Sequence, residues 1–427
     1  MKYGLIGEHL PHSFSKEIHG RLASYTYELC ELAPSEVGPF MEKADFEAIN
    51  VTIPYKETVL PYLDGLHEAA HLIGSVNTVV RRDGRLVGYN TDFFGLSALL
   101  THIGMDLAGR KVLILGTGGT ARTARAVARA KGAGCVLSVS RRSGEETVSY
   151  DEAVTQHRDA DVIVNTTPCG MFPYADGTER IAGCPIDISL FPRLSGVVDA
   201  VYNPLRTNLV QNARARGIPA EGGLYMLVAQ AAVASRIFRG EEPEAIVADP
   251  RVVAETERIF REIEAEKENI VLTGMPSSGK TTVGRLLAEQ LGRPFIDTDE
   301  EIVKEAGENI PRLFAEGGEA AFRDLESRVI RRVADSVTGA VIATGGGAIL
   351  RDKNVRALSR TGRIYFLDRP YELLAPTDDR PLSANAELLR TLYIERYPKY
   401  LATSDVTVPN LTAPEDAAEL IRKDLFL

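Results

Sequence analysis

The sequence predicts an α/β protein built from more than one compact unit. The chain has 427 residues, enough for about three domains at ~150 residues each. Short apolar runs alternate with helical patterns along most of the chain, which is typical of parallel sheets covered by helices. Two glycine-rich turns, at 116–121 and 274–281, each follow an apolar run and open a helical pattern. They lie in two halves with unrelated patterns, which indicates a fusion rather than a duplication.

Composition excludes several classes of protein. Hydrophobic residues make up 44% and charged residues 25%, the balance of an ordinary globular chain. The net charge of −10 argues against nucleic-acid partners, which need a basic footprint, and against an anionic membrane surface. No apolar run reaches the ~18 residues of a membrane span. The four cysteines (Cys30, Cys135, Cys169 and Cys184) form no Cys-x-x-Cys pair, so we expect a reducing compartment, the cytoplasm.

The first half contains the elements of two sheets. We expect strands at 3–6 and 48–53, followed by amphipathic helices. A second alternation begins near residue 105, with strands at 111–115, 135–139 and 161–165 and a helix over 120–130. A helix of small and apolar residues follows over 222–239.

The composition changes at Glu241. From there the chain is charged, with a long helical pattern over 252–267, so we expect a solvated helical linker over 241–268. A new strand at 269–273 starts another α/β alternation that runs to the end of the chain. All seven histidines lie before residue 160, so chemistry in the last third has no histidine base.

The first glycine-rich turn fits the dinucleotide-binding pattern G-x-G-x-x-A of a Rossmann fold. Its first glycine makes a tight turn, its second lets the backbone approach a pyrophosphate, and the helix that follows supplies N–H groups. The residues are Gly116, Thr117, Gly118, Gly119, Thr120 and Ala121. The next strand ends in Arg141 and Arg142, and arginine suits the 2′-phosphate of NADP. The alternative is two solvated arginines at a strand end.

Polar clusters elsewhere in the first half carry a family resemblance. They are HSFS at 12–15, NVTIPYKE at 50–57, SVNT at 75–78 and YNTD at 89–92, with NTTPCGM at 165–171, YNP at 202–204 and MLVAQA at 226–231. In this order, together with the glycine-rich turn, they resemble shikimate dehydrogenase over residues 1 to about 240. The resemblance implies a substrate domain over 1–104, completed by 222–240, and an NADP domain over 105–221.

The resemblance also assigns roles to individual residues. It implies that Lys56 and Asp92 are the catalytic pair, with Lys56 exchanging the proton while hydride moves between NADPH and the 3-carbonyl carbon of 3-dehydroshikimate. It implies that Ser13, Ser15 and Tyr202 bind the carboxylate and that Thr52, Asn77 and Gln230 bind ring hydroxyls. At the cofactor it places Ser140, Arg141, Arg142, Met171, Ala200 and Gly223.

The second glycine-rich turn fits the P-loop pattern G-x-x-x-x-G-K-[ST]. Its backbone N–H groups cradle phosphates, Lys280 reaches the β and γ phosphates, and the Thr281 hydroxyl binds Mg²⁺. The other turn residues predicted to contact the nucleotide are Gly274, Ser277, Ser278, Gly279 and Thr282. Asp297 and Asp299 follow the next strand, where carboxylates suit a metal ion or a hydroxyl base; the alternative is a helix N-cap.

Later motifs complete a second resemblance. FIDTD at 295–299 is followed by FRDLE at 322–326, TGGG at 344–347, RPL at 380–382 and ER at 395–396. In this order they resemble shikimate kinase, a P-loop fold like that of nucleoside-monophosphate kinases, over 269–427. The resemblance implies that Asp299 binds the 3-hydroxyl of shikimate and acts as base, and that Asp297 helps to hold Mg²⁺. It implies that Arg323, Arg396 and backbone groups of Gly345, Gly346 and Gly347 hold shikimate, and that Arg380 approaches the phosphates of ATP.

Both halves therefore point to the same small molecule, because the product of the first is the substrate of the second. We expect a bifunctional enzyme that uses NADP(H), ATP and Mg²⁺. Two alternatives remain: the first half is a quinate or broad-specificity dehydrogenase, or the chain is a sensor that binds these compounds without turning them over. The sequence leaves the oligomeric state open, including a homo-oligomer.

Overall fold

The computed structural model describes residues 1–10, 13–172, 184–375 and 385–425. The chain forms two compact units, Met1–Ile263 and Glu264–Leu427. Each unit has hydrophobic clusters of its own: those around Ile18, Phe191 and Phe46 belong to the first, and those around Leu287, Ile330 and Tyr400 to the second. No helix described in either unit is long and apolar enough to cross a membrane.

The first sheet of the first unit has the strand order β2-β1-β3-β5-β6-β4. Its strands are β1 (Tyr3–Gly7), β2 (Tyr27–Glu31), β3 (Ala48–Val51), β4 (Gly65–Leu66), β5 (Thr78–Arg82) and β6 (Arg85–Tyr89). The sheet is mixed, since β5 runs antiparallel to β3 and β6. The helices of this part are α1 (Ser15–Leu22), α2 (Pro34–Lys43), α3 (Glu68–Ile73) and α4 (Thr91–His102).

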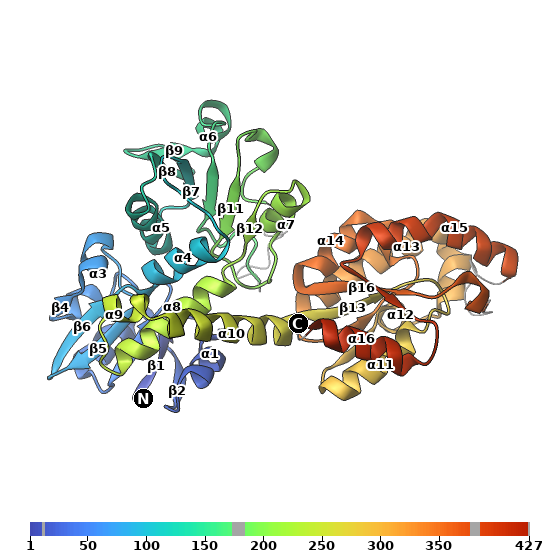
Figure 1. The fold of residues 1–427 in the computed structure, drawn as a ribbon, viewed down its shortest axis with the longest axis horizontal. Helices are drawn as coiled ribbons and strands as arrows, with labels where there is room; N and C mark the ends of the chain where they lie inside the picture. The colour runs from blue at the N-terminus through green and yellow to red at the C-terminus, as the bar shows by residue number, and fades with distance from the viewer. Residues whose placement is uncertain (11–12, 173–183, 376–384, 426–427) are drawn as a thin grey trace. The chain divides into compact units, whose positions relative to one another are not determined.

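The second sheet of the first unit is parallel, with the order β12-β11-β10-β7-β8-β9 (Figure 1). Its strands are β7 (Lys111–Leu115), β8 (Cys135–Ser140), β9 (Thr147–Ser149), β10 (Val162–Asn165), β11 (Gly196–Asp199) and β12 (Ala220–Glu221). Its helices are α5 (Gly119–Ala130), α6 (Tyr150–Gln156) and α7 (Asn208–Ala215). Strands β10 and β11 are buried throughout, and β7 is buried except at Lys111, as expected for a sheet covered on both faces.

Helix α8 (Leu224–Phe238) returns the chain to the first sheet and packs along α4. Helices α9 (Pro243–Ala248) and α10 (Pro250–Lys267) follow, in the range expected to be a solvated linker. The structure differs from that expectation. Val252, Ile259 and Ile263 of α10 are buried in the same cluster as α4 and α8, because they recur on one face of the helix. Most of α10 therefore belongs to the first unit.

The second unit is built on one parallel sheet with the order β14-β15-β13-β16-β17 (Figure 1). Its strands are β13 (Asn269–Thr273), β14 (Phe295–Asp297), β15 (Val341–Ala343), β16 (Gly362–Asp368) and β17 (Val406–Pro409). Its helices are α11 (Lys280–Leu291), α12 (Thr298–Ala306), α13 (Ile310–Ser336), α14 (Asp352–Thr361), α15 (Ala386–Thr403) and α16 (Pro414–Leu425). The carboxyl ends of β13, β14 and β15 meet at one edge, where open α/β sheets bind ligands.

Candidate functional sites

The centre of the first site is an ion pair between two elements of the first unit. Lys56 lies in the turn after β3, and Asp92 lies in the first turn of α4, which Asn90 caps by accepting from the Phe93 N–H at 3.2 Å. The Lys56 Nζ donates to Asp92 Oδ2 at 2.5 Å, and the two side chains are 15% and 11% exposed. The pair is thus shielded yet reachable, as a group that exchanges a proton with a ligand must be.

A network of neutral polar side chains lies near Asp92, at the start of α4. Asn77 donates to Thr91 Oγ1 at 3.0 Å and accepts from the Thr91 N–H at 2.6 Å. Thr91 also donates to Gln230 Oε1 at 3.1 Å, and Asn77 donates to the same oxygen at 3.5 Å. All three are buried, so this network fixes the Asn77 and Gln230 amides before any ligand arrives.

The remaining predicted substrate residues lie on loops at the edge of the first sheet and beside the second. Ser13 Oγ accepts from the Ser15 N–H at 3.3 Å at the start of α1. The ring of Tyr202 lies 5.2 Å from that of Phe14, between the two serines in sequence. Thr52 directly follows β3, and its N–H donates to Ile6 O. The structure thus places Tyr202 beside the loop that carries the two serines. Among the described residues, the Thr52 side chain forms no hydrogen bond with Ser13, Ser15 or Tyr202.

The first glycine-rich turn contacts the catalytic turn. A Cβ on Gly119 would lie 3.1 Å from Ser75 Oγ and 3.8 Å from Lys56 Cδ, so a larger residue here would press on Ser75. Arg122 of the same helix pairs with Glu57 at 2.9 Å. The N-terminus of α5 therefore lies beside Lys56, and its N–H groups would hold a dinucleotide phosphate there.

At the end of β8, Arg141 and Arg142 are exposed. The nearby Arg125 and Arg129 both pair with Glu146, at 2.8 and 2.6 Å. Within the described ranges no carboxylate pairs with Arg141 or Arg142. Ser140 Oγ donates to Arg142 O at 2.6 Å and so shapes the turn that carries them. Two unneutralised guanidinium groups at this strand end suit a phosphate.

The second site surrounds the P-loop. Gly274 and Gly279 have φ of 151° and 86°, values that favour glycine, and Ser277 also has positive φ, at 63°. Lys280 is buried and donates to Gly274 O at 3.0 Å and to Met275 O at 2.8 Å. The Nζ is therefore held over the loop in which a phosphate would sit.

The carboxylates after β14 have separate surroundings. Asp297 Oδ2 accepts from the Thr281 hydroxyl at 2.9 Å, and its other oxygen accepts from the Asp299 N–H at 3.0 Å, so Asp297 is also the N-cap of α12. Thr281 and Asp297 supply oxygen ligands of the kind that Mg²⁺ prefers. Asp299 faces the other way: its Oδ1 and Oε1 of Glu326 both lie against Gly345.

Arginines converge on the TGGG turn. Arg323 donates from Nη1 to both carboxylate oxygens of Glu326, at 3.0 and 2.9 Å. Arg396 donates to Gly346 O at 3.0 Å, and burial together with the like charge of Arg323 lowers its pKa. Burial raises the pKa of Glu326, although Arg323 opposes the shift. Arg323 also pairs with Glu319, a half-exposed carboxylate, at 3.2 Å. Within the described residues Arg396 forms no salt bridge, which leaves its charge for an anionic ligand.

Close packing explains the glycine at 347. A Cβ there would overlap the guanidinium of Arg323. We therefore expect Gly347→Ala to displace Arg323 and to raise the KM for the second unit's anionic substrate by about tenfold or more, the scale of one charge-assisted hydrogen bond. Steady-state kinetics of phosphorylation measure this. Gly20→Ala is the control, since a Cβ on Gly20 of α1 meets no atom within 4 Å. An unchanged KM in Gly347→Ala would contradict the clamp.

Sequence reasoning missed several residues of the second site. Asn410, just after β17, donates to Ser278 O at 2.6 Å and is 3% exposed, so it holds the P-loop from the far end of the chain. Tyr400 donates to Gly346 O at 2.6 Å, and Thr298 Oγ1 accepts from the Gly345 N–H at 3.1 Å. Asn410 and Tyr400 stand in none of the motifs, and Thr298, although it lies within FIDTD, is neither of the two carboxylates that mark that motif. Arg380, predicted to approach the phosphates, lies outside the described residues.

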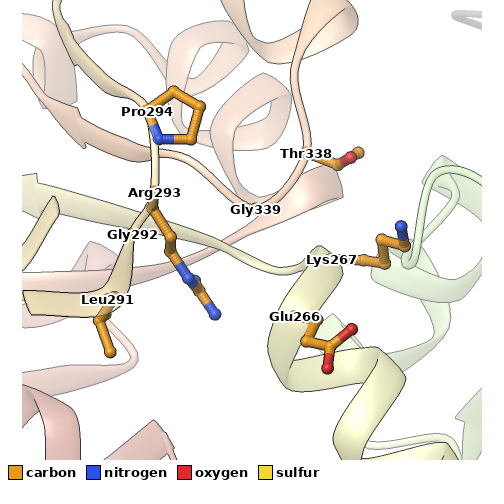
Figure 2. A pocket seen from close by; sticks show the side chains of 8 residues that line it. All are labelled: Glu266, Lys267, Leu291, Gly292, Arg293, Pro294, Thr338 and Gly339. Atoms are coloured by element: carbon orange, nitrogen blue, oxygen red, sulfur yellow. The ribbon is translucent and has the colours of Figure 1, made fainter.

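A separate cavity of about 400 Å³ lies in the second unit at the amino ends of the strands, away from the P-loop (Figure 2). It is lined by Glu266 and Lys267 of α10 and by residues 291–294 and 338–339. Arg293 donates to Ala265 O at 2.5 Å and to Glu268 O at 3.0 Å, closing the last turn of α10. Its guanidinium is engaged in this capping.

The comparisons with known proteins agree with the two sites. Residues 5–79 match the family model of the shikimate dehydrogenase substrate binding domain, and residues 276–425 match that of shikimate kinase. The shikimate dehydrogenase (NADP(+)) of Geobacillus kaustophilus is 36% identical over 264 residues, 57% of this chain and 94% of that protein.

Solved structures cover the same half. A chorismate mutase/shikimate 5-dehydrogenase fusion protein from Clostridium acetobutylicum is 32% identical, with a TM-score of 0.54 over 61% of this chain and 96% of that one. Shikimate 5-dehydrogenase from Thermus thermophilus, in complex with NADP(H) and shikimate, is 28% identical, with a TM-score of 0.50 over 61% and 99%. The chain therefore belongs to the shikimate dehydrogenase family and carries, over residues 276–425, a shikimate kinase domain.

Proposed function

We propose that this chain reduces 3-dehydroshikimate to shikimate with NADPH and then phosphorylates shikimate with ATP. The observation that carries the proposal is that two separate sites, the Lys56–Asp92 pair and the Arg323–Arg396 clamp beside the P-loop, belong to families that share one compound. The matched relatives act with NADP by name, which supports the same cofactor here.

In the first unit we assign proton transfer to Lys56. NADPH supplies the hydride to the carbonyl carbon, and the oxygen that gains negative charge takes a proton from the Lys56 ammonium. Asp92, 2.5 Å from Nζ, aims the lysine at the ligand, and a proton from solvent restores the ammonium after turnover. The fixed amides of Asn77 and Gln230 orient the ring hydroxyls, and Ser13, Ser15 and Tyr202 bind the carboxylate.

In the second unit we assign the base to Asp299 and the carboxylate clamp to Arg323 and Arg396. The 3-hydroxyl of shikimate attacks the γ-phosphorus of ATP, its proton passes to Asp299, and ADP leaves. Lys280 neutralises the charge that develops on the phosphate oxygens. Thr281 and Asp297 would hold Mg²⁺, which would supply further positive charge against the phosphates.

The test is the complete conversion. Purified chain supplied with 3-dehydroshikimate, NADPH, ATP and Mg²⁺ is expected to release shikimate 3-phosphate, NADP and ADP in equal amounts. Quinate in place of shikimate, assayed in the oxidative direction, measures the breadth of the first site. Binding of shikimate without turnover at either site would contradict the proposal and favour a sensor.

The cofactor preference gives a second test. We expect the double variant Arg141→Ala, Arg142→Ala to raise the KM for NADP by about tenfold or more per lost contact, at ~1.5–3 kcal/mol each, and to leave the KM for NAD nearly unchanged. The reason is that only NADP carries the 2′-phosphate. Arg129→Ala, which removes an arginine already paired with Glu146, is the control. An unchanged NADP preference would mean that Arg141 and Arg142 are merely solvated.

We further propose the cytoplasm as the compartment, since the reaction draws on NADPH and ATP. All four cysteines are free thiols in the structure, which accords with a reducing environment.

A further inference from the structure

Asp199, at the end of β11, is a fully buried carboxylate. Its oxygens accept three hydrogen bonds from neutral donors: Asn165 Nδ2 at 2.9 Å, the Val201 N–H at 3.0 Å and the Thr207 hydroxyl at 2.7 Å. In the described part of the chain no lysine, arginine or histidine forms a salt bridge with it. A buried carboxylate without a cation is costly, so its place in the fold is informative.

The three donors stand on two different loops. Asn165 ends β10 and, through its own oxygen, accepts from the Thr167 N–H at 3.1 Å and the Thr167 hydroxyl at 2.7 Å, which shapes the loop over 166–171. Val201 and Thr207 lie on the loop over 200–207, where Thr207 also caps α7 by accepting from the Val210 N–H. The Asp199 carboxylate is therefore the point at which the two loops are joined.

These two loops carry residues that the family resemblance assigns to the first site, Met171 and Ala200 to the cofactor and Tyr202 to the substrate carboxylate. Met171 is on one, and Ala200 and Tyr202 are on the other. Two further hydrogen bonds join the loops. The Phe172 N–H donates to Asn203 O at 2.7 Å, and Asn203 Nδ2 donates to Phe172 O at 3.1 Å. Gly223 packs so closely on Ala200 that a Cβ would overlap the Ala200 carbonyl. A shift of either loop would thus move Met171 or Ala200, the residues assigned to the cofactor.

We propose that Asp199 is a positioning residue for hydride transfer. Its ionised carboxylate holds the Met171 loop and the Ala200–Tyr202 loop in fixed positions relative to each other. It does not touch the reacting atoms itself. The proposal rests on the dehydrogenase site assigned above.

Ionisation matters because only the charged form accepts at both oxygens without a proton of its own. Protonation of Oδ2 would reverse the contact with Thr207: the carboxyl O–H would donate to a hydroxyl that already accepts from the Val210 N–H, and the hydroxyl hydrogen would lose its acceptor. Burial raises the pKa of Asp199 from its ordinary value to about 6, although the hydrogen bonds from Thr207, Val201 and Asn165 oppose the shift. The thiols of Cys169 and Cys184 are the other titratable groups that interact with it, and burial raises the pKa of both.

The sign of the stability effect follows. Because the folded pKa lies above the unfolded value of 3.8, the folded chain binds this proton more tightly. The stability that protonation adds is complete below about pH 4 and is lost as the pH rises through about 6. We expect the dehydrogenase activity to change in the opposite direction. Protonation of Asp199 adds stability to the fold, but it disturbs the alignment of the two loops. If Asp199 had only a structural role, stability and dehydrogenase activity would change in the same direction with pH.

The experiment compares Asp199→Asn, which keeps the shape, with Asp199→Ala in the full chain. At pH 8 we expect the dehydrogenase kcat to fall about tenfold in Asp199→Asn and about 10²-fold in Asp199→Ala, the scale of a small misplacement, with a smaller change in the KM for shikimate. The acid limb near pH 6 in the wild-type kcat profile should be absent in Asp199→Asn, as should the stability change between pH 4 and 6. Kinase kcat, measured on the same samples, should stay at the wild-type value.

A wild-type kcat at pH 8 with an unchanged acid limb in Asp199→Asn would overturn the inference. So would a lower unfolding temperature with unchanged kcat per folded molecule, which is what a purely structural role predicts. If Asp199→Ala does not fold, Asp199→Asn alone decides. Lys56→Met separates the two proposals, because retained reduction in that variant refutes the assigned site itself, whereas its loss leaves only the role of Asp199 in question.

Discussion

Lys56→Met is expected to lower the dehydrogenase kcat by about 10²–10⁴-fold, the range for a positioned acid–base group, and to leave shikimate phosphorylation at the wild-type rate. Methionine keeps the length of the side chain and removes the ammonium that donates to Asp92 at 2.5 Å. Each unit has its own hydrophobic clusters, so the change in the first turn after β3 should not disturb the second unit.

The measurement is a pair of assays on one preparation, NADPH oxidation with 3-dehydroshikimate and ADP release with shikimate. Lys43→Met, an exposed lysine on α2 that pairs only with Asp45, is the matched control and should keep both rates. A folded Lys56→Met chain that loses both activities would contradict independent sites. One that keeps its reductase rate would remove Lys56 from the mechanism.

Lys280→Met should give the reverse pattern. We expect the kinase kcat to fall by about 10³-fold, because a preorganised donor aimed at developing phosphate charge is lost, while reduction of 3-dehydroshikimate continues unchanged. Lys280 now donates to two P-loop carbonyls and is 5% exposed, so methionine fills the same space without the charge.

Shikimate affinity is the internal control for that variant. Calorimetric titration with shikimate should reproduce the wild-type isotherm, to which both units contribute, since we assign the carboxylate bound in the second unit to Arg323 and Arg396, on α13 and α15. A kinase kcat within tenfold of the wild type would show that the Lys280 charge is dispensable. A large loss of shikimate affinity would instead indicate a collapsed site.

Local signals in the sequence were enough to predict many of the elements and the two nucleotide turns. The apolar runs at 111–115 and 269–273 are β7 and β13 as the structure has them, and the helix expected over 120–130 is α5. These elements are short and apolar or strongly periodic, and glycine marks their ends. The family and the activity, first inferred from ordered motifs, are confirmed by the comparisons. The roles of individual site residues stay predictions.

Long-range pairing is what the sequence did not reveal. The hydrogen bond from Asn410 to Ser278 joins residues 132 positions apart, and nothing around an asparagine after a strand indicates its partner. The junction at Asp199 depends in the same way on the neighbouring ends of β10 and β11. The antiparallel run of β5 in the first sheet was not expected either, because an apolar strand carries no sign of its direction.

The capping of α10 by Arg293 affects the choice of the first residue for a separate kinase fragment. A fragment that begins at Asn269, the first residue of β13, would lack the Ala265 and Glu268 carbonyls to which the guanidinium donates, and also the Lys267 carbonyl that accepts from the Gly339 N–H at 2.9 Å. These donors would lose their protein acceptors at the amino edge of the sheet. We therefore expect a kinase fragment that starts upstream of Ala265 to be more stable than one that starts at Asn269, although the earlier turns of this helix belong to the dehydrogenase cluster.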